Sequence, residues 1–82
     1  MTGLVLYHRP GCHLCEQMLA SIYGTYGDEI EVELINVDSD PRLKERFGDR
    51  IPVLTADGKV VCEGRLDVPA LDAFFHGLAG IS

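Results

Sequence analysis

Two cysteines three positions apart, Cys12 and Cys15, stand between a short apolar run and a helical pattern. The run Leu4–His8 is rich in residue types that favour a buried strand, and Arg9–Gly11 ends it. From Leu14 to Tyr26 the apolar residues recur at helical spacing. A strand, a tight turn and a helix whose first turn holds two cysteines are together typical of a redox-active dithiol.

The start of a helix favours the reactive form of Cys12. Backbone N–H groups there have no partner inside the helix, and together with the helix dipole they stabilise a negative sulfur. The thiolate is the nucleophilic form of cysteine. Residues i and i+3 lie on one helix face, so Cys15 can reach the Cys12 sulfur. We therefore expect a nucleophilic Cys12 with Cys15 beside it.

Length and composition limit the class of protein. The 82 residues (9.0 kDa), 46% of them hydrophobic, suffice for one modest core, and we expect a single domain over residues 1–82. Three cysteines are too few for a disulfide-stapled scaffold. No basic leader and no run of about 20 apolar residues is present, so we expect a cytoplasmic protein without a membrane partner. The net charge of −6 argues against nucleic acid, and we expect a monomer.

Local patterns predict four strands and three helices. Asp40-Pro41 is typical of a helix start, and Asp57-Gly58 between two β-rich runs predicts a hairpin. After Asp67, an apolar stripe that ends with Leu78 predicts the last helix. The order β-α-β-α-β-β-α predicts an α/β fold with a four-stranded mixed sheet and helices on both faces. The predicted strands span residues 4–8, 31–37, 51–55 and 59–62, and the predicted helices span residues 13–26, 41–47 and 68–78.

This order resembles the thioredoxin fold in its minimal, glutaredoxin-like form. The chain is similar to small glutaredoxin-like proteins of bacteria in three motifs, and the resemblance runs from Leu4 to about Leu78. It implies a thioredoxin-like fold with a dithiol site. The motifs are Tyr7-His8-Arg9-Pro10-Gly11-Cys12-His13-Leu14-Cys15, Arg50-Ile51-Pro52-Val53-Leu54 and Gly64-Arg65-Leu66-Asp67.

The resemblance implies roles for individual residues. Cys12 corresponds to the family's nucleophile and Cys15 to its resolving thiol. Pro52 corresponds to the cis-proline that faces the dithiol, and the backbone of Ile51 is expected to pair with an extended substrate. His13 lies between the cysteines, where it either stabilises the thiolate as a cation or is an exposed histidine with a mild effect.

Four residues are candidates for contacts with glutathione or another anion: Arg9, Arg50, Gly64 and Asp67. Arg9 stands where glutaredoxins often carry a lysine, and a cation there favours the thiolate and meets a carboxylate. Gly64 and Asp67 resemble the end of the γ-glutamyl signature, in which a helix N-terminus takes a carboxylate. Arg9, Arg50 and Arg65 either converge on one anion or are three separate solvated arginines.

Three departures loosen the link to glutathione. His13-Leu14 replaces the Pro-Tyr of common glutaredoxins, and Arg50 replaces the threonine that they carry before their Val-Pro pair. Glu63 replaces the first of two glycines at the γ-glutamyl site. An acidic side chain that points into a carboxylate site opposes binding there. The motifs therefore favour the dithiol chemistry more strongly than they favour one substrate.

We expect a thiol–disulfide oxidoreductase without a bound cofactor, which reduces protein disulfides or glutathione mixed disulfides. Electrons would come from glutathione as a co-substrate or from a flavin-dependent reductase. The alternative is a thioredoxin-fold binding or carrier module for a metal, an iron–sulfur cluster or a partner, without redox turnover. Zinc needs four ligands, which Cys12, Cys15, Cys62 and either His8 or His13 nominally supply. Otherwise Cys62 is expected to be an inert strand cysteine.

Overall fold

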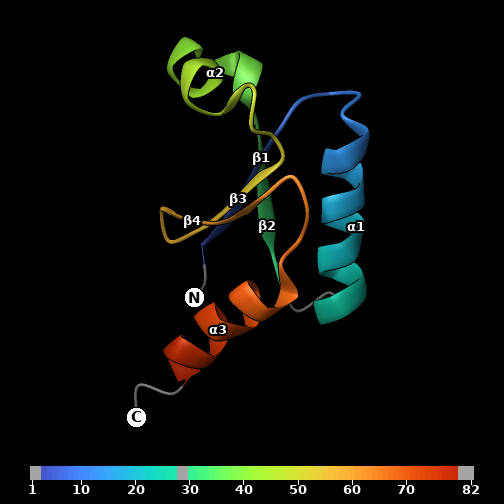
Figure 1. Ribbon diagram of the computed structural model, residues 1–82, viewed down its shortest axis with the longest axis vertical. Helices are drawn as coiled ribbons and strands as arrows, with labels where there is room; N and C mark the ends of the chain where they lie inside the picture. Colours follow the sequence, from blue (N-terminus) through green and yellow to red (C-terminus); the bar gives the residue numbers. More distant parts are fainter. Residues whose placement is uncertain (1–2, 28–29, 80–82) are drawn as a thin grey trace.

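A four-stranded mixed sheet organises the chain (Figure 1). The computed structural model describes residues 3–27 and 30–79, with backbone alone at residues 77–79. The strand order is β2-β1-β3-β4; β1 is parallel to β2, and the other two pairs are antiparallel. The predicted α/β fold class is confirmed. In chain order the elements are β1 (Leu4–His8), α1 (His13–Tyr26), β2 (Val32–Asn36), the 3-10 turn η2 (Val37–Ser39), α2 (Pro41–Phe47), β3 (Val53–Ala56), β4 (Lys59–Glu63) and α3 (Val68–Ala79).

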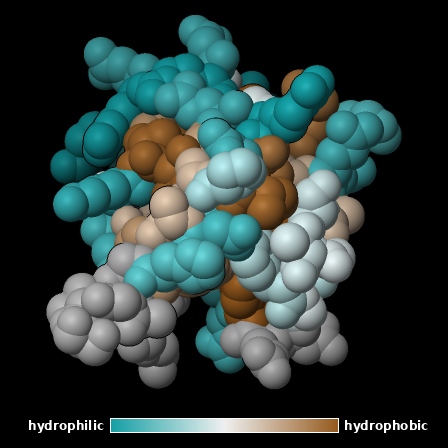
Figure 2. Space-filling model, turned by 60° about the horizontal axis from the view of Figure 1, so that its bottom comes forward, coloured by the Kyte–Doolittle hydropathy of each residue, from teal (hydrophilic) through white to brown (hydrophobic). Residues whose placement is uncertain are grey.

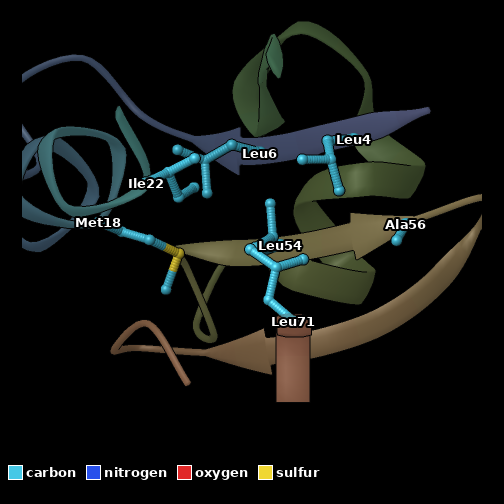
Figure 3. Close-up of a cluster of buried hydrophobic side chains, with 7 residues drawn as sticks. All are labelled: Leu4, Leu6, Met18, Ile22, Leu54, Ala56 and Leu71. Atoms are coloured by element: carbon cyan, nitrogen blue, oxygen red, sulfur yellow. The ribbon is translucent and has the colours of Figure 1, made fainter. Parts of the chain in front are cut away.

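One face of the sheet packs against α1 and α3. Side chains alternate along each strand, so Leu4 and Leu6 of β1 point to the same side as Leu54 and Ala56 of β3. Figure 3 shows these four residues meeting side chains of the two helices. The buried cluster consists of Leu4, Leu6, Met18, Ile22, Leu54, Ala56 and Leu71.

The opposite face packs against α2. Phe47 and Val53 are buried in a second cluster, against which Tyr7 packs. The rings of Tyr7 and Phe47 lie 4.6 Å apart between centroids. Tyr7 and Val53 are opposite each other on β1 and β3 and alternate with the residues of the first cluster. Helices therefore cover both faces, as predicted.

Side chains cap the starts of α2 and α3. Asp40 accepts a hydrogen bond from the Arg42 N–H at 2.8 Å, and Pro41 occupies the first helical turn. Asp67 likewise accepts from the Ala70 N–H at 3.0 Å. The predicted starts of both helices therefore follow from local hydrogen bonding.

The two helices on the first face are also joined by a polar contact. The Tyr26 hydroxyl near the end of α1 donates a hydrogen bond to the Asp72 carboxylate in α3 at 2.6 Å. The Tyr26 ring packs edge-on against Phe75. Desolvation by burial, followed by this hydrogen bond to a carboxylate, raises the pKa of Tyr26 to about 12.

The bounds of three predicted strands and one predicted stripe need correction. The second strand ends at Asn36, because the Asn36 side chain accepts the Asp38 N–H at 2.9 Å and turns the chain into η2. The third strand begins after Pro52, which has no N–H to donate to a ladder. The fourth strand extends to Glu63. In α1 the buried stripe starts at Cys15, since Leu14 is 53% exposed. The side chain of Leu78, predicted for the last stripe, lies outside the described residues.

The β3–β4 hairpin contains a bulge. Leu54 is opposite Cys62 and Thr55 is opposite Val60, so Val61 has no residue opposite it. Cys62 consequently faces the same side as Leu54, and Glu63 faces the side of Val53, where α2 packs.

The topology gathers several connections at one end of the sheet. Residues that follow β1, β2 and β4 and those that precede β3 all lie there, together with α2 and the start of α1 (Figure 1). At the other end, around α3, hydrophilic side chains divide the apolar surface into separate patches (Figure 2). No helix within residues 3–27 and 30–79 is long and apolar enough to cross a membrane.

Candidate dithiol site

A tight turn presents Cys12 at the start of α1. The Cys12 N–H donates to the Arg9 carbonyl at 3.1 Å, and Gly11 adopts φ +79°. Proline at the second position and a residue with positive φ at the third are the features of a type II turn, and Pro10 and Gly11 supply them. Glycine adopts this φ without a steric penalty. Pro10 and Gly11 therefore occur between β1 and α1 because the turn that presents Cys12 requires them.

Cys12 is the N-cap of α1. Its backbone is extended (φ −80°, ψ 106°), and its sulfur accepts a hydrogen bond from the Cys15 N–H at 3.2 Å. The two cysteines form a disulfide, with Cα atoms 5.2 Å apart. Cys12 is half-buried, whereas Cys15 is only 4% exposed. The two sulfurs therefore differ both in access to solvent and in their hydrogen bonding.

The Ile51–Pro52 segment lies beside this turn. Tyr7 of β1 is opposite Val53 of β3, so the chain before β3 lies next to the chain after β1. The Ile51–Pro52 peptide bond is cis. The Pro52 carbonyl accepts a hydrogen bond from the Gly64 N–H at 2.8 Å, which fixes the end of β4 beside the proline. Gly64 has φ +74°, a conformation that suits glycine.

Arg9 is held by a carboxylate. Its Nε and Nη2 atoms donate to the two oxygens of Asp38 at 2.9 and 3.1 Å. Because β1 and β2 are parallel, the residues just after each strand are neighbours, which explains this contact. The Arg9 hydrogen bond holds the pKa of the Asp38 carboxyl below its usual range, and the same contact raises the pKa of Arg9.

Arg50 makes a second, separate ion pair with Glu63. The Arg50 Nε donates to Oε1 of Glu63 at 2.9 Å, and Nη2 contacts Oε2. This hydrogen bond lowers the pKa of the Glu63 carboxyl and raises that of Arg50. The Arg50 guanidinium also lies over the Phe47 ring, 5.6 Å from its centroid. Arg9 and Arg50 thus have different carboxylate partners, while Arg65 is exposed.

The remaining candidate residues are Asp67, His13 and Cys62. Asp67, expected at a γ-glutamyl site, caps α3 through Ala70. His13 is exposed in the first turn of α1. Cys62 is half-buried, and burial raises the pKa of its thiol even though the Asp67 N–H acts in the opposite direction. A raised pKa reduces the fraction of reactive thiolate.

The nominal zinc ligands are not assembled. Across the described parts of the chain, no three His, Cys, Asp or Glu side chains gather into a group that could hold a metal ion. A structural zinc site needs four such ligands in a tetrahedron.

The comparison with known families agrees with this geometry. Residues 3–76 match the family described as Glutaredoxin-like domain (DUF836). The chain belongs to this glutaredoxin-like family. A comparison with curated proteins found no match.

Two solved structures are similar to this glutaredoxin-like protein. The solution NMR structure of protein Ne2328 from Nitrosomonas europaea is 38% identical, with a TM-score of 0.76 and 89% of each chain covered. The X-ray structure of target protein XcR50 from X. campestris is 29% identical, with a TM-score of 0.74; the match covers 92% of this chain and 97% of that chain. Both share the fold over nearly their whole length.

Sequence reasoning missed the partners of the two arginines. Asp38 was not singled out in the sequence, and Glu63 was noted only as a replacement for glycine. A helix between two consecutive strands favours parallel pairing, which places the residues after the two strands side by side. That pattern was the available signal for the contact of Arg9 with Asp38. The contact of Arg50 with Glu63 depends on the face that Glu63 takes, which the bulge at Val61 determines.

Proposed function

We propose that this glutaredoxin-like protein is a thiol–disulfide oxidoreductase of the reducing cytoplasm. The observation that carries the proposal is the asymmetry of the pair: Cys12 is reachable and caps the helix, whereas Cys15 is buried directly beside it. A thiol that attacks a substrate must be reachable, and the helix start favours its thiolate. A resolving thiol needs to reach only the first sulfur, and the Cys12–Cys15 bond meets that need.

The reaction consists of two thiol–disulfide exchanges. The Cys12 thiolate attacks one sulfur of a substrate disulfide, forms a mixed disulfide and releases the other sulfur as a thiolate, which takes up a proton. Cys15 then loses its proton and attacks the Cys12 sulfur. The substrate leaves as a second thiol, and the Cys12–Cys15 disulfide remains. Two electrons have moved from the dithiol to the substrate, and an external thiol or a flavin-dependent reductase must return them.

We propose protein disulfides, rather than glutathione, as the preferred substrates. Glutathione carries carboxylates, which arginines bind well when their donors are free. Arg9 and Arg50, the cations nearest to the turn and to Ile51-Pro52, already donate to Asp38 and Glu63. A peptide segment can instead use the backbone of Ile51, which needs no free cation.

Two variants test the mechanism. Cys12→Ser should abolish reduction of insulin and of glutathione disulfide, because the nucleophile is lost. Cys15→Ser should accumulate mixed disulfides on Cys12, which intact-mass spectrometry detects. Full reduction of both substrates by Cys12→Ser would overturn the proposal.

A redox titration of the Cys12–Cys15 pair tests the electron source. A potential near −270 mV would group the protein with thioredoxin, and one of about −200 mV would group it with glutaredoxins. The titration should be followed by turnover assays with glutathione and with thioredoxin reductase as reductants. Failure of both reductants, together with metal or visible absorbance in protein purified without oxygen, would favour the carrier module instead.

A further inference from the structure

A groove opens beside the dithiol on the side away from Pro52. Its volume is about 220 Å³, and its wall includes Cys12, Cys15 and Leu34 of β2. In the strand order β2-β1-β3-β4, β2 lies on one side of β1, whereas Pro52 precedes β3 on the other side. The groove is therefore a second surface next to the reactive sulfurs, separate from the proposed backbone contacts of Ile51.

The floor of the groove is apolar. Leu6 and Leu34 are opposite each other on the parallel strands β1 and β2, so their side chains share one face. Leu19, one helical turn after Cys15, lines the groove from α1. Leu34 is 47% exposed, which leaves apolar surface in water directly beside the site of chemistry. Covering such surface is favourable in proportion to its area.

The size of the groove fits one large side chain. Pockets for drug-sized ligands and cofactors have volumes of about 300–1,000 Å³, which is larger than this groove. A cavity of about 150 Å³ is large enough for benzene. A volume of about 220 Å³ thus accommodates a leucine, methionine or phenylalanine side chain.

The charges at the rim favour a basic partner. Arg9 contributes to the wall, but its charge is paired with Asp38, to which its Nε and Nη2 atoms donate. Glu16 supplies the carboxylate of the lining, which also contains His8, and the whole chain has a net charge of −6. A carboxylate at the rim of an acidic protein attracts cationic groups and repels acidic segments.

We propose that this groove binds a large apolar side chain next to the disulfide cysteine of a protein substrate, with a basic residue beside it that faces Glu16. The inference rests on the proposed oxidoreductase function, which it narrows to substrates with an apolar and basic segment around the target cysteine. Leu34 and Glu16 are then residues that determine specificity, while Cys12 and Cys15 perform the exchange.

Three disulfide-linked peptides test the substrate preference. The first has leucine and lysine next to its single cysteine, the second has glycine in place of leucine, and the third has glutamate in place of lysine. The wild-type protein should reduce the first with a kcat/KM about tenfold above the second, which corresponds to about 1.4 kcal/mol. The third peptide should also be slower than the first. Equal rates for the first two peptides would overturn the proposal.

Three variants test whether residues of the groove cause these substrate preferences. Leu34→Ser should remove the preference for leucine over glycine, and Glu16→Gln should remove the preference for lysine over glutamate. Val60→Ser is the matched control, because Val60 is 40% exposed on β4, the opposite edge of the sheet. Val60→Ser should keep both preferences, and dividing each variant's peptide rates by its rate with hydroxyethyl disulfide removes any change in the reactivity of Cys12. An unchanged leucine preference in Leu34→Ser would refute the role of the groove.

A binding measurement separates this inference from the proposed function. The first peptide with serine in place of cysteine cannot react, yet it should shift the NMR signals of Leu19 and Leu34. Binding without these shifts, or no binding at concentrations at which the disulfide peptide is turned over, would overturn the groove. If the peptide shifts these signals but wild-type protein reduces no disulfide, hydroxyethyl disulfide included, the oxidoreductase function fails while the groove stands.

Discussion

The Cys12 sulfur caps α1 and is also the nucleophile of the proposed function, and substitution can separate these two roles. Cys12→Ser and Cys12→Ala both remove the disulfide and the nucleophile. Serine keeps an acceptor for the Cys15 N–H, which the Cys12 sulfur now accepts at 3.2 Å, and alanine keeps none. Loss of an N-cap acceptor costs about 1 kcal/mol of stability. We therefore expect two equally inactive variants that differ in stability.

The size of that difference follows from the length of the chain. The entropy of unfolding is about 2.1 cal/mol/K per residue, which gives about 0.17 kcal/mol/K for 82 residues. A cap worth about 1 kcal/mol therefore shifts the melting temperature by about 6 °C. Cys12→Ser should melt at the higher temperature when both variants are followed by circular dichroism in the same buffer.

Cys15 provides the matched control. Its side chain is buried and is not the N-cap of α1, so Cys15→Ser should have no advantage over Cys15→Ala. Equal melting temperatures for the two Cys12 variants would refute the capping role of the sulfur. So would a serine advantage at Cys15 as large as the one at Cys12.

Three further predictions concern pairs of side chains. Tyr26→Phe removes the hydrogen bond to Asp72 and should lower the melting temperature by about 6 °C, for a loss of about 1 kcal/mol. Because the pKa of Tyr26 is raised to about 12, this difference should hold below about pH 10 and shrink as the pH rises toward 12; a difference that grew with pH would contradict the assignment. Asp38→Asn should remove a stabilising contribution that is present above about pH 4 and is lost as the pH falls through the lowered pKa of Asp38, so acid titrations of wild type and variant should converge at low pH. Glu63→Gln should release Arg50 and lower the KM for glutathione disulfide several-fold in steady-state assays without changing that for hydroxyethyl disulfide; an unchanged KM for glutathione disulfide would show that the ion pair does not limit its binding.

The parts of the fold that could be predicted depend on local chemistry. Asp40 and Asp67 cap helices through the N–H groups two and three residues later. Asp57 and Gly58 both adopt positive φ, 51° and 84°, as a type I′ hairpin turn requires. The turn before Cys12 likewise needs only its own proline and glycine. These signals were sufficient for the order of elements.

The parts that could not be predicted depend on which distant residues meet. Leu14 fits the helical spacing, yet the packing of α1 leaves it exposed, because periodicity alone does not define the edge of the buried face. Arg9 and Arg50 were recognised as cations near the site, but their carboxylate partners are 29 and 13 residues away in the chain. The groove also escaped prediction, since Leu34 reaches the dithiol only through the pairing of β2 with β1.

The bulge at Val61 determines to which face of the sheet the later side chains of β4 point. With strict alternation from Lys59, Glu63 would point into the core and Cys62 toward α2. Because of the extra residue, Cys62 instead points to the side of Leu54, and Glu63 points to the opposite side, where it contacts Arg50. We expect a chain without Val61 to form a regular hairpin in which Cys62 and Glu63 keep their faces, while the packing of Val61 against the first cluster is lost. The bulge thus sets which side chains β4 presents at the end of the sheet that holds the dithiol.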